Sequence, residues 1–81
     1  MTQQKRVDIK RGDCVEALSS TDASLVAGIV TMFHGDDLMV RPFTGDSPVP
    51  CFQISRKVDW GELGESQTER AKVIHQELGL V

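Results

Sequence analysis

Short apolar runs, separated by glycine, aspartate and proline, fill most of the chain before Trp60. Alternation of apolar and polar residues, or a high content of β-branched residues, is typical of strands rather than helices. The pattern predicts five β-strands, over residues 7–10, 14–18, 25–33, 38–41 and 49–54. So many short strands in so few residues favour a small, strongly bent β-barrel.

The longest of these runs, 25–33, is apolar on both of its faces. One face carries Leu25, Ala27, Ile29 and Phe33, and the other carries Val26, Val30 and Met32. Gly28 interrupts the run, and a glycine inside a strand often marks a bend or a bulge. We therefore expect the sheet to curl at Gly28.

Turn residues separate the predicted strands. Arg11-Gly12-Asp13 predicts one turn, and His34-Gly35-Asp36-Asp37 predicts a tight hairpin in which Gly35 adopts a positive φ. His34, Asp36 and Asp37 carry oxygen and nitrogen ligands, but the turn lacks the number of ligands that calcium needs. A solvated hairpin tip is the simpler interpretation.

The last part of the chain has a helical pattern instead. Ser66 and Glu69 have the spacing of a capping box, and Ala71, Ile74 and Leu78 share one helical face. Gly79 then predicts a left-handed cap on which Leu80 folds back toward Ile74. The pattern predicts a helical segment over 66–79 that is too short to be stable alone. It must pack on the barrel or on a partner, and a homodimer through this helix is one alternative.

Composition indicates one small soluble domain over residues 1–81, with the barrel over 7–58. The chain has 81 residues, a net charge of −3 and a pI of about 5.2. An acidic balance disfavours a dedicated nucleic-acid binder, which usually has a basic excess. Because no signal peptide or membrane-spanning run is evident, we expect a cytoplasmic protein without a membrane partner. Cys14 and Cys51 are then buried thiols, or a disulfide if the strands bring them together.

Four motifs carry a resemblance to a known group of folds: Gly12-Asp13-x-Val15, Ala27-Gly28-Ile29-Val30, Gly35-Asp36 and Leu38-x-Val40-Arg41. Over residues 7–58 the chain resembles the Src-homology-3-like small barrels, in their Tudor and KOW-type forms. The resemblance implies a mainly β, five-stranded barrel, and the helical pattern adds one C-terminal helix to it. The chain has no tyrosine, so it departs from the aromatic grooves and cages of several such barrels.

No catalytic or metal motif is evident in the sequence. Cys14, His34, Cys51 and His75 would supply the ligands of a zinc site, but they lack the closely spaced pairs that such sites use. Nucleophilic catalysis by either cysteine would need a neighbouring histidine and an orienting group, and no local pattern supplies them. We therefore expect a protein that is not an enzyme and needs no cofactor.

The candidate binding residues are basic or aromatic: Lys10, Arg11, Arg41, Phe43, Arg56, Lys57 and Trp60. The five basic residues would form a phosphate-contacting patch if the strand ends converge, with Phe43 or Phe52 stacking on a base. Alternatively, they solvate strand ends. Trp60 either plugs the barrel end or forms a hot spot for a protein.

The sequence thus predicts a non-enzymatic binding module that acts through a protein partner, as an accessory or regulatory subunit. The alternative is a KOW-like nucleic-acid-binding module.

Overall fold

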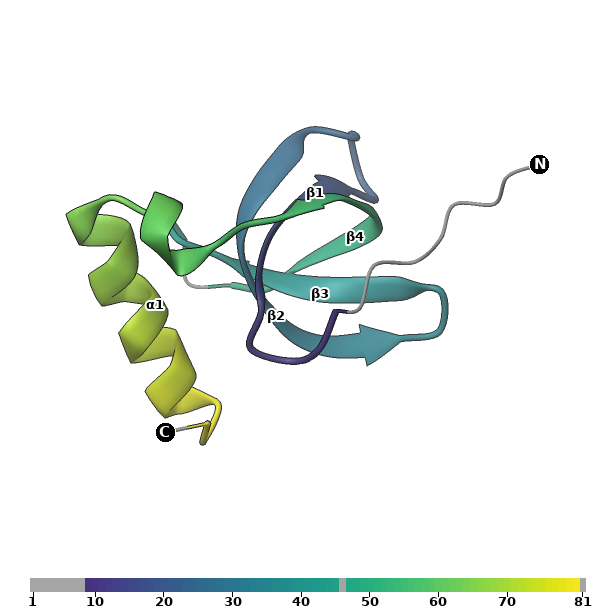
Figure 1. Ribbon diagram of the computed structural model, residues 1–81. Coiled ribbons are helices and arrows are strands. Elements are labelled where there is room, and N and C mark those ends of the chain that lie inside the picture. Colours follow the sequence, from purple (N-terminus) through teal and green to yellow (C-terminus); the bar gives the residue numbers. More distant parts are fainter. Residues whose placement is uncertain (1–8, 46, 81) are drawn as a thin grey trace.

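Four strands form a closed antiparallel barrel in the computed structural model, which describes residues 9–45 and 47–80 (Figure 1). In chain order the elements are β1 (Cys14–Ser19), β2 (Leu25–His34), β3 (Asp37–Pro42), β4 (Val49–Lys57), the 3-10 turn η1 (Trp60–Glu62) and the helix α1 (Glu65–Glu77). Each strand pairs with the next one, and β1 closes the barrel by pairing with β4. The fold is mainly β and is compatible, at the level of architecture, with a Src-homology-3-like barrel.

The prediction of a fifth strand over 7–10 is wrong for the residues that can be described. Val7 and Asp8 lie outside them, and Ile9 and Lys10 belong to no strand. The N–H of Lys10 donates to the Asp13 carboxylate at 2.9 Å, and the N–H of Asp13 donates to the Lys10 carbonyl at 3.0 Å. Because this turn satisfies both backbone groups of Lys10, a ladder is not needed there.

The two apolar faces of β2 serve two different cores. Val26 and Val30 point into the barrel, where the buried residues are Val15, Ala17, Val30, Leu38, Val40 and Cys51. Ala27 and Ile29 point outward into a second cluster, in which the buried residues are Cys14, Ile29, Phe43, Val58, Ala71 and Ile74. The double apolar pattern therefore reflects a strand that is covered by the barrel on one side and by α1 on the other.

The bulge in β2 lies at Thr31, and not at Gly28 as the sequence suggested. The pairing of β2 with β3 shifts register between Val30 and Met32. Gly28 has a different purpose, because a Cβ atom placed there would overlap the carbonyl oxygen of Arg41. Glycine at this position lets the backbones of β2 and β3 approach closely.

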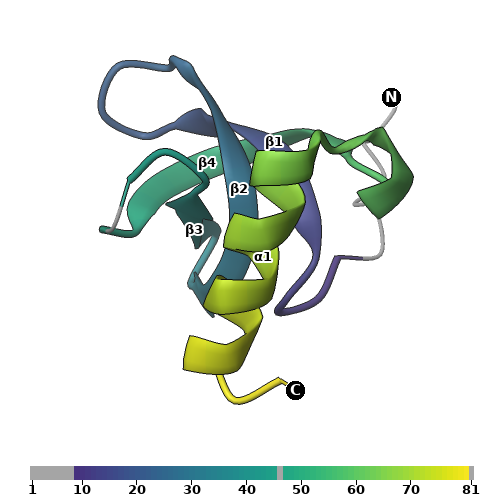
Figure 2. The ribbon, with the colours of Figure 1, turned by 90° about the vertical axis from the view of Figure 1, so that its left-hand side faces the viewer.

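Helix α1 covers the outside of the barrel beside β2 (Figure 2). Ala71 and Ile74 have no solvent-exposed surface, so the predicted apolar stripe packs on the barrel itself. Val73, which is 41% exposed, points away from this contact. The apolar stripe of α1 therefore packs on the barrel and not on a partner, whereas Val73 remains available to solvent.

Both ends of α1 are capped, and only the C-terminal cap agrees with the prediction. Gly79 has φ 74° and donates to the Gln76 carbonyl, while Leu80 donates to the His75 carbonyl, as in a Schellman motif. At the other end, the N–H of Gly64 donates to the side-chain oxygen of Gln67 at 3.2 Å. The cap is therefore Gly64 with Gln67, and not Ser66 with Glu69.

The side chain of Leu80 lies near Gly12. A Cβ atom on Gly12 would come within 2.7 Å of Leu80 Cδ1, so Leu80 lies against the turn before β1.

Candidate functional site

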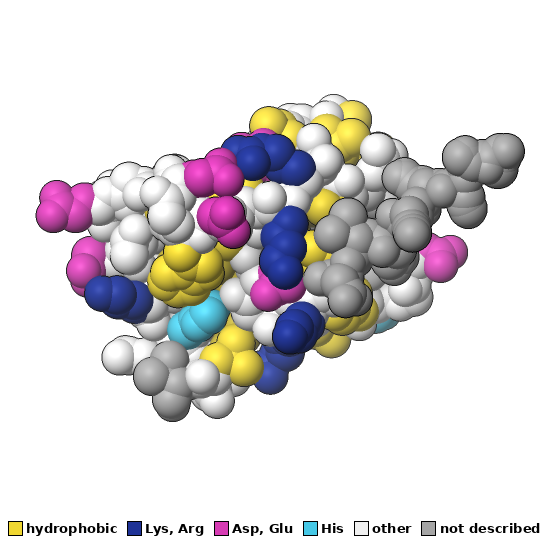
Figure 3. Space-filling view, viewed as in Figure 1, with side chains coloured by type: hydrophobic (Ala, Val, Ile, Leu, Met, Phe, Trp, Pro, Cys, Tyr) yellow, Lys and Arg dark blue, Asp and Glu magenta, His cyan; other side chains and the backbone are white. Residues whose placement is uncertain are grey.

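Two of the predicted basic residues, Arg56 and Lys57, belong to an ion-pair network at the end of β4. Arg56 contacts Glu16 at 3.1 Å and Glu62 at 2.8 Å, and Lys57 contacts Asp13 at 3.5 Å. Figure 3 shows a face on which basic and acidic side chains lie next to one another. The hydrogen bond from Arg56 lowers the pKa of Glu62, which keeps this carboxyl ionised. The positive charge of Arg56 and Lys57 is therefore largely balanced locally.

Arg11 and Arg41 instead attach the C-terminal half of α1 to the barrel. Arg11 donates to the Thr31 carbonyl at 3.0 Å and to the Leu78 carbonyl at 3.1 Å. Arg41 makes an ion pair with Glu77 at 2.6 Å. Both contacts use a cation near the C-terminus of a helix, where the helix dipole favours positive charge. The predicted basic patch is thus split between two structural tasks, and Lys10 lies exposed in the turn with Asp13.

The two predicted aromatic site residues differ in exposure. Phe43 is only 6% exposed and belongs to the cluster under α1, so its ring cannot stack on a base. Trp60 lies in η1, with its ring edge-on to His75 at a centroid distance of 5.0 Å. His75 Nε2 in turn donates to the Gly12 carbonyl at 2.7 Å. Trp60 is half-exposed and packs on the end of α1 instead of plugging the barrel.

Both cysteines are free and buried, and each lies in a different core cluster. This separation excludes the Cys14–Cys51 disulfide that the sequence left open. Burial, together with the charge of Glu16, raises the pKa of the Cys14 thiol to about 11. Burial also raises the pKa of Cys51. Neither thiol is set up as a nucleophile, because the thiolate is the reactive form.

The four residues considered for zinc do not converge. His34 is exposed at the end of β2 and His75 is bonded to Gly12. Within residues 9–45 and 47–80, no three His, Cys, Asp or Glu side chains are grouped so as to hold a metal ion. In the same part of the chain, no helix has the length and apolar character needed to cross a bilayer.

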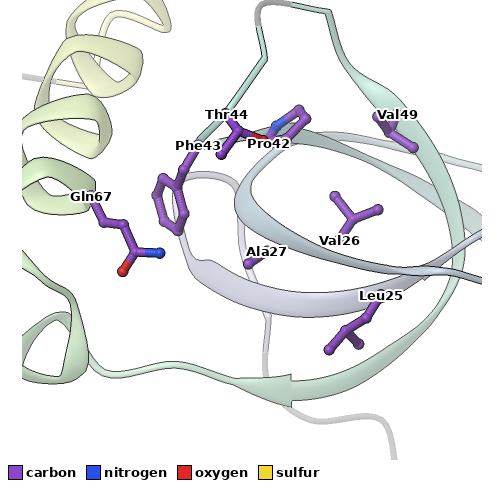
Figure 4. Close-up of a pocket in the computed structure, with 8 residues that line it drawn as sticks. All are labelled: Leu25, Val26, Ala27, Pro42, Phe43, Thr44, Val49 and Gln67. Carbon is purple, nitrogen blue, oxygen red and sulfur yellow. The ribbon is translucent and has the colours of Figure 1, made fainter.

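An open groove of about 310 Å³ lies between the start of β2, the end of β3 and the beginning of α1 (Figure 4). Its walls are mainly apolar and include Leu25, Val26, Phe43 and Val49. Gln67 is the polar residue on the helix side, and its oxygen is already used by Gly64. The volume is at the lower limit of ordinary ligand sites, so the groove accommodates a side chain more readily than a whole substrate.

The structure also has an exposed apolar surface that the sequence analysis did not predict. On the outer face of β2, β3 and β4, the strand register aligns Met32 with Met39 and Met39 with Pro50. Phe52 follows Pro50 at the next outward position of β4. We call these four residues the outer apolar strip. Met32 is 51% exposed and Phe52 is 47% exposed, so the strip presents large apolar side chains to solvent.

Sequence reasoning missed the strip because its members come from three strands and meet only through the register. The bulge at Thr31 turns Met32 outward, and no signal in the local sequence indicates a bulge at that position.

Comparisons of the chain with protein families, with curated proteins and with solved structures each find no match. Only the chemistry of the chain's own surface therefore bears on its function.

Proposed function

We propose that the protein is a small non-enzymatic binding module that acts through a protein partner, as an accessory or regulatory subunit. The outer apolar strip is the observation that supports this proposal. Its residues are not needed to fill either core, because the barrel interior and the cluster under α1 are both built from other side chains. Exposed methionine and aromatic side chains are typical of the centre of protein interfaces.

The nucleic-acid alternative has less support from the arrangement of charges. A phosphate at Arg56 or Lys57 would have to compete with Glu16, Glu62 and Asp13 for the same cations. Counterion release, which drives most binding to nucleic acids, needs cations that are available to the phosphates. The protein-binding proposal therefore uses an exposed surface, whereas the alternative needs ion pairs to break first.

Affinity capture from the native cell tests the proposal when variants are compared side by side. We expect wild-type protein to retain a partner that the double variant Met39→Ser/Phe52→Ser loses. Val73→Ser on α1 is the matched control, because it removes an exposed apolar side chain outside the strip. Retention of the same partners by all three proteins would refute the assignment of the strip.

A salt series separates the two functions. Binding through the strip should persist from low to moderate salt, because apolar burial depends little on ionic strength. Binding of short single- or double-stranded nucleic acids that perturbs Arg56 and Lys57 and disappears with salt would instead favour the alternative.

A further inference from the structure

We propose that the outer apolar strip docks a partner segment in which apolar side chains stand next to Lys or Arg. Asp36 and Asp37 would receive the positive charge. This inference rests on the proposed function and adds the chemistry of the partner to it.

The strand geometry places one of these carboxylates next to the strip. Leu38 and Val40 of β3 are buried in the barrel, so Asp37 and Met39 alternate with them and face outward. Asp36 is exposed in the hairpin turn that leads into β3. Burial is the main cause of the raised pKa of Cys51 in β4, and the negative charge of Asp37 adds to it, so the field of this carboxylate extends to β4.

Asp36 and Asp37 differ from several other acidic residues because they are not ion-paired to a described Lys or Arg. Asp13, Glu16, Glu62 and Glu77 each have a Lys or Arg partner. Asp36 and Asp37 have no ion pair with any residue in the described ranges 9–45 and 47–80. Arg41, two positions beyond Met39, is engaged by Glu77. The strip is therefore bordered by negative charge that the described part of the protein does not balance.

This distribution of charge favours one occupant over others. An acidic partner would meet uncompensated carboxylates beside the apolar contact, and like charges at an interface are unfavourable. A second copy of the chain would bring its own acidic turn and a further net charge of −3. A segment with both apolar and basic side chains would cover the strip and also place positive charge beside the two carboxylates.

Three synthetic peptides of equal length test the inference against the full-length labelled protein in amide ¹H–¹⁵N spectra. One alternates Leu with Arg, the second alternates Leu with Glu, and the third alternates Ser with Arg. We expect the Leu–Arg peptide to shift the amides of Met32, Met39 and Phe52 and to bind most tightly. The double variant Asp36→Asn/Asp37→Asn should bind it about 3- to 10-fold more weakly, as for two exposed charge pairs.

The matched control is Glu65→Gln/Glu69→Gln, which removes two exposed charges from α1. It should leave the affinity for the Leu–Arg peptide unchanged, and both double variants should retain dispersed spectra. Equal binding of the Leu–Glu peptide to the strip would overturn the charge preference while leaving the proposed function standing. Equal binding of the Ser–Arg peptide would overturn the apolar part.

Two further results would also count against the inference. Shifts that cluster on α1 and not on the strip would place the site elsewhere, and the absence of shifts with all three peptides would overturn the chosen partner chemistry. Sedimentation of the free protein provides the last check. Concentration-dependent dimerisation that Met39→Ser/Phe52→Ser abolishes would show that a second copy, and not a basic segment, covers the strip.

Discussion

Replacing Gly28 with alanine tests whether close approach of β2 and β3 is what requires glycine at this position. The new methyl group would overlap the Arg41 carbonyl oxygen, and it would lie 2.7 Å from the Arg41 carbonyl carbon and 2.8 Å from Pro42 Cα. These are backbone atoms, so no side-chain rotation relieves the contact. The two strands must separate where Gly28 pairs with Pro42.

Three contributions determine how much the substitution lowers the free energy of unfolding. Ordinary carbon–carbon contacts are about 3.5–4.0 Å, so the strands must move apart by about 1 Å. Such overpacking costs about 1–3 kcal/mol, and weakening one or two ladder hydrogen bonds adds about 1 kcal/mol each. Alanine restricts the unfolded chain and returns about 0.4–1 kcal/mol. The net loss is about 3 kcal/mol, which lowers the Tm by about 12–24 °C in a domain of this size.

Urea unfolding followed by circular dichroism measures this loss, with two other glycines as controls. A Cβ atom at Gly61 would meet no atom within 4 Å, and φ is not positive there, so Gly61→Ala should change stability by less than about 0.5 kcal/mol. Gly35 has equal space but φ +63°, so Gly35→Ala isolates backbone strain at about 1 kcal/mol. A Gly28→Ala protein as stable as Gly61→Ala would refute the close-approach argument.

Three other predictions concern the core, the thiols and a loop. Ile74→Ala should destabilise the protein by about 2–5 kcal/mol in urea unfolding because Ile74 is fully buried, whereas Val73→Ala should change it by less than about 0.5 kcal/mol. The pKa of the Cys14 thiol is raised from 9.0 to about 11, so the folded state retains a proton that the unfolded state loses; stability should fall between about pH 9 and pH 11, and Cys14→Ala should flatten that decline. Ala23 has φ 59°, a backbone conformation that is strained for a residue with a Cβ atom. Ala23→Gly should therefore stabilise the protein by up to about 1 kcal/mol and raise its Tm in calorimetry, whereas Ala23→Val should lower the Tm. Equal Tm values would contradict strain at this residue.

Much of the fold was predictable because its signals are local. The strands from Cys14 onward, the hairpin at Gly35 and the left-handed cap at Gly79 follow from alternation and from the backbone freedom of glycine. The sequence showed that the run over 25–33 is apolar on both faces, but only the structure showed that the barrel interior covers one face and α1 the other. The fifth strand failed because Lys10 satisfies its backbone groups in a turn with Asp13, which alternation alone does not reveal.

The candidate site was less predictable, because it depends on which distant residues meet. The sequence identified Arg41, Arg56 and Lys57 as cations, but it could not show that Glu77, Glu16, Glu62 and Asp13 are their partners. It also placed Phe43 among the candidate binding residues and named Phe52 only as an alternative stacking residue. Only packing under α1 buries the first and leaves the second exposed.

By itself, then, the sequence indicated where the strands from β1 onward lie along the chain, where the turns lie and that a C-terminal helix follows. These features depend on residues that are close in the chain. Tertiary structure decided that the helix covers the barrel and that Arg41, Arg56 and Lys57 are ion-paired. It also decided that four residues from three strands form the outer apolar strip. The physical reason is register. One extra residue at Thr31, in the pairing of β2 with β3, changes which side chains of β2 face solvent.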